Sequence, residues 1–444
     1  MSIQFLQNKF TLIDDILKNF YLGAKPEKEF RIGAEIERIN ISNKTFEAIS
    51  YLEIENFLRI YSEKYNWKKI VNDNHLLGLE KDGNIISLEP GSQLELSIAP
   101  CMDIFQLKKI MDNFNSQSAQ IAEKMGFSFL GYGIQPLSTF DKIKIIPKKR
   151  YKTMTEYFKD KGALAYVMMR ETAGCQVTLD YQSEKDAMRK LRLGMILAPI
   201  ISSMFANSPI RGGKQTGYQS FRAQSWLFVD EDRCGIISKK LIEDNFSFRQ
   251  YMDYLLDSPM IFVTRNNKNI KIPLSFREYL KSGWQGLFAT IDDFNLHANL
   301  FFPEVRLKNF LEFRNADAQS PLMALALMAL YKGIFYNEEA LIKTEKLFEN
   351  IDFQTLEQLR QQSPQKGLQT HINGSKILEF AINLIKIAKK SLNKQAEINN
   401  QETEGIFLNI LQNFTLQAKT PSDILIEKTE GKIEKILELT KIHP

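Results

Sequence analysis

The strand-like segments of this chain alternate polar and apolar residues, and this alternation restricts the fold more than any other feature. In residues 30–39, Glu35 and Glu37 fall on one face of a strand, and the apolar side chains between them fall on the other. The strands of a parallel sheet are buried on both faces and run continuously apolar instead. Similar segments occur irregularly near residues 76–98, 127–134, 172–181, 224–230 and 302–314, separated by helical stretches. The pattern predicts an α+β fold with an antiparallel sheet.

The polar faces of several of these segments carry acids and amides. They are Glu35 and Glu37; Gln93, Glu95 and Ser97; Gln176, Thr178 and Asp180; and Glu312 with Arg314. One interpretation is a set of half-exposed strands whose polar residues face water. The other is that the faces converge into a cage of hard oxygen ligands, which suits Mg²⁺ bound together with nucleotide phosphates. The pattern alone leaves both open.

The segment 302–317 sets acids and arginines among apolar residues. Glu312 and Arg314 are two positions apart, so on a strand they point to the same face. A carboxylate beside a guanidinium suits a metal-bound phosphate, because the acid holds the cation and the arginine binds phosphate oxygens. A structural ion pair has the same pattern.

The composition indicates a cytoplasmic protein without a nucleic-acid or membrane partner. Among 444 residues, 58 basic side chains oppose 53 acidic ones, and both signs are dispersed, so the basic run over residues 142–150 is expected to be a solvated loop. The three cysteines Cys101, Cys175 and Cys234 form no CxxC pair, which favours a reducing compartment. We expect no signal or transit peptide at the N-terminus, and the apolar runs are too short to span a bilayer.

The sequence lacks the common phosphate-binding and zinc-binding motifs. There is no GxxxxGK[ST] loop and no GxGxxG fingerprint, and the four histidines do not cluster. Cys175 falls on the apolar side of its strand, as expected for a buried structural thiol. Any phosphate chemistry must therefore use carboxylate-held metal ions and arginines.

The pattern changes from strands to helices along the chain. Residues 2–22, 51–66, 102–125 and 183–203 have helical patterns, and Ser320-Pro321 predicts a helix start before the apolar run 322–330. We expect an α+β domain over residues 1–345 and a helical region over residues 346–444 that packs on it, with a polar loop near 393–404. A separate regulatory helical domain is the alternative for the C-terminal region.

Ordered motifs over residues 30–340 resemble the plant-type family of glutamate–cysteine ligases, which also occurs in bacteria. The motifs are Gly33-Ala-Glu35-Ile-Glu37, Glu89-Pro-Gly91-Ser-Gln93-Leu-Glu95, Gln176-Val-Thr178-Leu-Asp180, Phe205-Ala-Asn207-Ser-Pro209, Gly217-Tyr218 through Arg222 to Trp226, Arg265-Asn266-Asn267, and His297 through Glu304-Val-Arg306 to Glu312-Phe-Arg314. The resemblance implies a glutamine-synthetase-like catalytic core, an antiparallel sheet curled into an open funnel with helices outside. It also implies ATP-dependent ligation of L-glutamate to L-cysteine through γ-glutamyl phosphate, as the first step of glutathione biosynthesis.

The resemblance also implies roles for individual residues. Glu35, Glu37, Glu89, Glu95 and Glu312 would bind Mg²⁺, and Glu312 and Arg314 would form the catalytic pair, with Arg314 on the transferring phosphoryl group. Gln176, Thr178 and Arg314 would contact ATP. Arg222 would bind the α-carboxylate of glutamate, and Arg170 is a second candidate for that contact. Glu312→Gln is expected to lower the rate steeply and to leave the fold intact.

Several alternatives remain within this framework. A related carboxylate–amine ligase could use a different amine, and a non-catalytic nucleotide-binding relative would keep the fold without turnover. Plant members are controlled by thiol–disulfide chemistry, but three cysteines offer no evident redox pairs here, so we expect no such switch. The protein is expected to be a monomer or a homodimer, and residues 2–22 could serve either a dimer contact or core packing.

Overall fold

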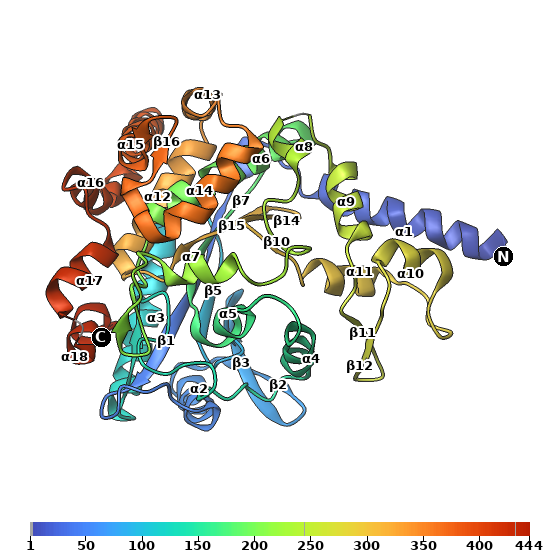
Figure 1. Ribbon diagram of the computed structural model, residues 1–444, viewed down its shortest axis with the longest axis horizontal. Coiled ribbons are helices and arrows are strands. Elements are labelled where there is room, and N and C mark those ends of the chain that lie inside the picture. The colour runs from blue at the N-terminus through green and yellow to red at the C-terminus, as the bar shows by residue number, and fades with distance from the viewer. Residues whose placement is uncertain (1–2, 244, 431) are drawn as a thin grey trace.

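The fold is organised around one nine-stranded antiparallel sheet (Figure 1). The computed structural model describes residues 3–243, 245–430 and 432–444, with side chains from residue 12 onward, so residue 2 of the predicted first helix lies outside it. The strand order is β14 (Val305–Leu307), β15 (Leu311–Asp317), β7 (Gly174–Leu179), β1 (Ile32–Ser42), β5 (Leu94–Cys101), β4 (Asn84–Leu88), β3 (His75–Lys81) and β2 (Lys68–Asn72). A ninth strand, β6 (Phe127–Leu130), pairs with the end of β1.

The predicted antiparallel α+β fold is confirmed. Every pairing within the sheet is antiparallel, and the sheet stays open, with β14 and β2 at its edges. The eleven-residue strand β1 is its centre, because β7 pairs along one side and β5 along the other. Its apolar residues Ile32, Ala34 and Ile36 are buried under helices, so the face with Glu35 and Glu37 is left for other contacts.

Four helices cover the apolar face of the sheet. They are α2 (Tyr51–Tyr65), α3 (Ile104–Lys124), α6 (Glu184–Met204) and α12 (Pro321–Phe335), which contact strands β3, β5, β6, β7, β14 and β15 between them. The predicted start of α12 is confirmed, since the Ser320 side chain caps the helix and Pro321 occupies its first turn. Its almost entirely buried apolar surface forms part of the main core.

Shorter helices approach the polar face of the sheet. They are α4 (Lys149–Phe158), α5 (Ala165–Glu171) and α7 (Phe221–Trp226). A further group lies to one end of the sheet in Figure 1: α1 (Ile3–Leu22), α8 (Lys239–Glu243), α9 (Phe248–Asp257), α10 (Phe276–Ser282) and α11 (Ile291–Ala298). Three short two-stranded pairs lie outside the main sheet, formed by β8 (Ile210–Arg211) with β9 (Lys214–Gln215), β10 (Cys234–Gly235) with β13 (Phe302–Pro303), and β11 (Phe262–Arg265) with β12 (Lys268–Lys271).

The C-terminal region is helical, and it packs on the rest of the chain. It contains α13 (Glu338–Leu347), α14 (Phe353–Lys366), α15 (Ile377–Asn399), α16 (Asn409–Leu416), α17 (Pro421–Thr429) and α18 (Ile433–Thr440), with the hairpin β16 (His371–Ile372) and β17 (Ser375–Lys376). Helix α15 packs against α12, and α14 packs against α6 and α7. Figure 1 shows these helices, in orange and red, gathered along one side of the sheet.

Four predicted segments need correction. Residues 224–230, predicted as a strand, lie at the end of α7 and in the turn after it, because Ser220 caps a helix there. The single segment 302–314 divides into β13, β14 and the start of β15, and 76–98 divides into three strands. The polar stretch 393–404 is only partly a loop, since α15 continues to Asn399 and ends at Asn400 in a left-handed conformation.

Among the described residues, none of the helices is both long and apolar enough to cross a membrane.

Candidate active site

The strand register brings the predicted acids together on one face of the sheet. Glu35 lies opposite Gln176 on β7 and opposite Ser97 on β5, and Glu37 lies opposite Glu95. The Gln176 side chain donates to Glu37 (Nε2 to Oε1, 3.2 Å). The acids and amides found separately on three strands are thus neighbours, because strands with the same alternation pair in register.

These side chains line a cavity of about 260 Å³ between the sheet and helices α4, α5 and α7. The sequence-predicted residues in its wall are Glu35, Glu37, Glu89, Glu95, Gln176, Arg222 and Arg314. Two others are absent from it, Thr178 and Arg170, and Glu312 lies beneath the wall. The structure therefore gathers most of the predicted residues at a single place.

Four carboxylates in this wall repel one another. Burial, followed by the charges of Glu312 and Glu95, raises the pKa of Glu35 to about 8. Burial and then Glu89 raise the pKa of Glu95 to about 8, and burial and then Glu37 raise the pKa of Glu89 to about 7. Burial also raises the pKa of Glu37, against the opposing effect of Arg222. A bound cation would relieve this shared electrostatic cost.

The carboxylates are spread along the cavity. Within the described ranges, no three His, Cys, Asp or Glu side chains form a ready-made metal-binding group. Mg²⁺ is commonly held by one or two carboxylates together with substrate phosphates and water. A spaced row of acids is thus a chemically suitable donor set for Mg²⁺ that arrives with a polyphosphate.

Glu312 differs from the other four acids because cations surround it. It is fully buried, and its oxygens accept from Arg306 Nη2 at 2.6 Å, from Lys308 Nζ at 2.7 Å and from Arg314. Although burial alone would raise its pKa, these three cations hold the pKa of Glu312 well below its usual range. In this arrangement Glu312 orients two arginines of the wall, Arg306 and Arg314.

Arg314 projects into the cavity from an irregular part of β15. The pairing between β15 and β7 shifts register between Phe313 and Ala316, and such a bulge turns a side chain away from the regular ladder. The guanidinium donates to Gln176 Oε1 at 2.6 Å and to Glu312. Arg314 also lines a second, smaller cavity, so it lies at the junction of the two.

Arg222 reaches the cavity from α7. Its Nη2 donates to the Arg314 carbonyl at 3.1 Å, and its buried Nε has no partner within the protein. The guanidinium lies against Gly174, where a Cβ atom would approach Nη2 to 2.5 Å. A glycine is thus required for this close approach, and Arg222 lines the cavity wall, where its side chain can meet a ligand.

Two predicted residues point elsewhere. The Arg170 guanidinium donates to the Phe140 carbonyl at 2.9 Å and stacks on Tyr166, so it holds the 140–143 loop. Thr178 lies between Gly33 and Glu312 in the strand register, but it does not reach the cavity wall.

The structure adds cavity residues that sequence reasoning missed. Residues 149–158 form α4, and the basic residues Lys148 and Arg150 line the cavity together with Tyr151, where the sequence suggested a solvated loop. Arg150 Nη2 donates to the Asn299 carbonyl at 3.1 Å, while its Nε is buried without a partner. No local signal distinguishes these residues from a solvated run, because their position depends on α4 docking against the sheet.

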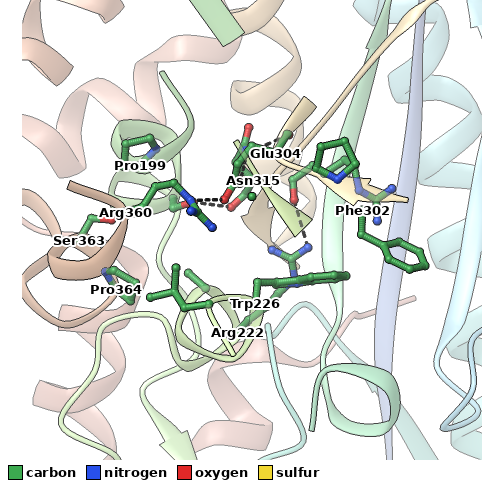
Figure 2. Close-up of a pocket in the computed structure, with 15 residues that line it drawn as sticks. Pro199, Arg222, Trp226, Phe302, Glu304, Asn315, Arg360, Ser363 and Pro364 are labelled. Atoms are coloured by element: carbon green, nitrogen blue, oxygen red, sulfur yellow. Dashed lines mark hydrogen bonds and ion pairs between the residues drawn. The ribbon is translucent and has the colours of Figure 1, made fainter. Parts of the chain in front are cut away.

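The smaller cavity, of about 30 Å³, connects the site to the C-terminal region (Figure 2). Arg222, Trp226 and Phe302 line both cavities. On the far side, Arg360 of α14 donates to Glu304 (Nε to Oε1, 3.0 Å), and Asn315 donates to the other Glu304 oxygen at 2.7 Å. Helix α14 is therefore part of the wall of the smaller cavity, next to Arg314.

Comparison with known proteins places this chain in a family. The family model described as glutamate-cysteine ligase family 2 matches residues 31–438. Curated relatives include glutamate–cysteine ligase B, chloroplastic, of Oryza sativa subsp. japonica, which is 34% identical over 96% of this chain and 85% of its own length. Glutamate–cysteine ligase, chloroplastic, of Nicotiana tabacum is 35% identical over 94% of this chain and 80% of its own length.

A solved structure has a similar fold at low sequence identity. The crystal structure of a glutamate–cysteine ligase from Francisella tularensis in complex with AMP matches with a TM-score of 0.58 and 13% identity. The match covers 93% of this chain and 87% of that one. The family model spans the β1 acids, the β7 amide and the β15 Glu-x-Arg pair alike. The chain belongs to glutamate-cysteine ligase family 2.

Proposed function

We propose that this protein ligates L-glutamate to L-cysteine at the cost of ATP, giving γ-glutamylcysteine, ADP and phosphate, and thereby supplies glutathione synthesis. The observation that carries the proposal is the wall of the larger cavity, in which acids from β1 and β5 face Arg314 and Arg222. Family membership supports the choice of glutamate and cysteine as substrates.

The first chemical step brings negative charges together. The γ-carboxylate of glutamate attacks the γ-phosphorus of ATP, forming γ-glutamyl phosphate and releasing ADP. Two unit charges about 4 Å apart repel by roughly 1 kcal/mol in water and about 4 kcal/mol at an effective dielectric constant near 20. Positive charge in the cavity must offset this repulsion, and Arg314 of β15 supplies it together with Lys148 and Arg150 at the start of α4.

The acids provide a second way to offset the repulsion between the γ-carboxylate and ATP. Glu35, Glu37, Glu89 and Glu95 would hold Mg²⁺, since they are hard oxygen donors whose mutual repulsion a divalent cation relieves. When bound, Mg²⁺ neutralises phosphate charge and lines up the polyphosphate. We assign Glu312 to the orientation of Arg306 and Arg314 in the arrangement described, because all of its close partners are cations.

Arg222 would fix the other end of glutamate. Its place in the wall of both cavities supports a contact to the α-carboxylate, and its Nη2 contact to the Arg314 backbone connects that end to the reacting end. The amine of cysteine then attacks the acyl carbon of γ-glutamyl phosphate and displaces phosphate. Holding both reactants in one cavity supplies much of the rate, because little covalent chemistry is asked of the protein.

An isotope experiment tests the acyl-phosphate step. With glutamate labelled by ¹⁸O in its γ-carboxylate, the proposal predicts that one ¹⁸O atom appears in the released phosphate for each dipeptide formed. Running the same assay with other amines tests whether the acceptor is cysteine. Unlabelled phosphate would overturn the mechanism, whereas labelled phosphate formed only with another amine would keep the mechanism and change the acceptor.

Glu95→Gln should raise the Mg²⁺ concentration needed for half-maximal rate by about 10- to 100-fold, the range typical of altered metal sites. Glu95 Oε1 accepts from Ser87 Oγ at 2.9 Å and from Ser97 Oγ at 3.1 Å, so the amide oxygen of glutamine can keep both contacts and the fold should survive. Titration of the rate with Mg²⁺ at saturating ATP measures the shift. An unchanged Mg²⁺ requirement would remove Glu95 from the metal site.

The remaining assignments follow the same proposal. The region from residue 346 onward would be a packed part of the enzyme instead of a separate regulatory domain, because Arg360 of α14 pairs with Glu304 in the wall.

The sparse cysteines favour a cytoplasmic location, although the rice and tobacco relatives are named as chloroplastic. A monomer or a homodimer fits the proposal.

A further inference from the structure

Asp317 ends strand β15 three residues after Arg314, but it does not line either cavity. Its side chain is 1% exposed. One carboxylate oxygen accepts from the Asn207 backbone amide and from Ser208 Oγ, both at 2.7 Å. The other accepts from Ser220 Oγ at 2.8 Å. These partners belong to the segments 205–209 and 217–226, which the sequence singled out but the proposed chemistry has not explained except through Arg222.

The two serines that donate to Asp317 also hold the first turn of α7. Ser220 is the N-cap of that helix, and its Oγ accepts from the Ala223 amide at 2.9 Å. Ser208 Oγ accepts from the Arg222 amide at 3.1 Å. Each hydroxyl thus donates a hydrogen bond to the carboxylate and accepts one from a backbone amide of the helix, so it acts as donor and acceptor at once. A helix of six residues is too short to be stable alone, so this attachment sets where α7 lies.

The charge of Asp317 also reaches the end of the Arg222 side chain. Arg222 Nη1 lies 4.0 Å from Asp317 Oδ1, and Nη2 donates to the Arg314 carbonyl. The carboxylate therefore acts on Arg222 at two points, through the backbone amide by way of Ser208 and through the guanidinium directly.

The residues around Asp317 hold its carboxylate in one position. A Cβ atom at Gly133 would lie 2.7 Å from Asp317 Cγ, so only glycine fits there. The Gly133 amide donates to the Asn207 carbonyl at 3.0 Å, and the Asn207 side chain donates to the carbonyls of Gly131 and Ala318, both at 2.8 Å. The acceptor for the two serines is thus itself fixed by its neighbours.

We infer that Asp317 is the positioning residue for Arg222, which it aims at the carboxylate-bearing substrate by fixing the start of α7. This inference rests on the proposed function, in which Arg222 binds the α-carboxylate of glutamate. Asp317 touches no substrate atom, so its effect on binding passes through Arg222.

Asp317→Asn tests the inference, because it keeps the shape and removes the charge. Asparagine has only one acceptor oxygen, so either the Asn207 amide and Ser208 or Ser220 must lose its acceptor, and the start of α7 should shift. We expect the KM for glutamate to rise at least about tenfold, since a small misplacement of a binding group has effects of this size. The KM for ATP should change less than about twofold and kcat less than about threefold.

Asp180→Asn is the matched control. Asp180 is also a buried aspartate at the end of a strand of this sheet, where it accepts from the Arg31 amide at 2.7 Å and pairs with Lys25 at 2.9 Å. Loss of the Asp180 charge should lower the stability of the fold without changing the ratio of the KM for glutamate to the KM for ATP. An equal rise of both KM values in Asp317→Asn, or the same pattern in Asp180→Asn, would overturn the inference and leave Asp317 a purely structural residue.

Two further measurements separate the inference from the proposed function. In an Arg222→Ala background, Asp317→Asn should add less than about twofold to the KM for glutamate, since its effect passes through Arg222; a full additional effect contradicts the inference. If Arg222→Ala alone leaves the KM for glutamate unchanged, the assignment of Arg222 fails first. If Asp317→Asn does not fold, Ser208→Ala and Ser220→Ala serve instead, and an unchanged KM for glutamate in both would overturn the inference.

Discussion

Arg314→Gln should lower kcat at least about 10³-fold, the effect expected when an arginine that stabilises a transferring phosphoryl group is lost. Arg314 projects from the β15 bulge into the junction of the two cavities, and its guanidinium is held by Gln176 and Glu312. Glutamine keeps a polar side chain but supplies no charge to offset the repulsion between carboxylate and polyphosphate. The measurement is the rate of ADP release at saturating substrates.

The fold should tolerate this change, because Glu312 keeps Arg306 and Lys308 as partners. Arg189→Gln is the control, since Arg189 also binds carboxylates, those of Glu345 and Glu338, on the surface of α6. That variant should retain full kcat. Arg314→Lys should recover only part of the rate, because lysine restores the charge without the two-pronged guanidinium. An Arg314→Gln enzyme within tenfold of the wild-type kcat would remove Arg314 from the phosphoryl site.

Glu312→Gln should both lower the rate and destabilise the fold. The substitution leaves Arg306, Lys308 and Arg314 without their shared carboxylate in a fully buried position. Removing one member of a buried ion pair typically costs about 3–5 kcal/mol of unfolding free energy. The rate should fall steeply because Arg314 and Arg306 lose the group that orients them. Chemical denaturation and the ADP-release assay measure the two effects.

Glu345→Gln is the control for stability. Glu345 also accepts two hydrogen bonds from one arginine, Arg189, but the pair is partly exposed, so its loss should cost no more than about 1 kcal/mol. The sequence alone predicted that Glu312→Gln would leave the fold intact, because it could not show how many cations share this carboxylate. Normal stability together with normal turnover in Glu312→Gln would contradict both roles.

The site residues that the sequence predicted best lie on regular strands. Alternation fixes which face a residue occupies, and pairing in register then brings Glu35, Glu37, Glu95 and Gln176 together without further information. The bulge that redirects Arg314 lies outside this rule, but the residue still lies near the predicted acids because its strand pairs with β7.

The sequence predicted the site residues least well where the position of a residue depends on how distant segments pack together. Trp226 lies in a run of apolar residues that suits a strand as well as a helix, and the outcome depends on Ser220, whose partner Asp317 is 97 residues away. Lys148 and Arg150 resemble a solvated run until α4 places them over the acids. Arg170 is close in sequence to β7, yet it points toward the 140–143 loop. Local patterns carry no information on such contacts.

The most direct test is the release of ADP and phosphate by the purified protein with Mg²⁺-ATP and glutamate, with and without cysteine, and with mass detection of the product. The account predicts cysteine-dependent turnover, one γ-glutamylcysteine for each ADP, and loss of both products in Arg314→Gln. Turnover with another amine but not with cysteine would contradict the proposed acceptor. No turnover with any amine, from protein that binds ATP, would contradict the proposal that this cavity is a ligase site.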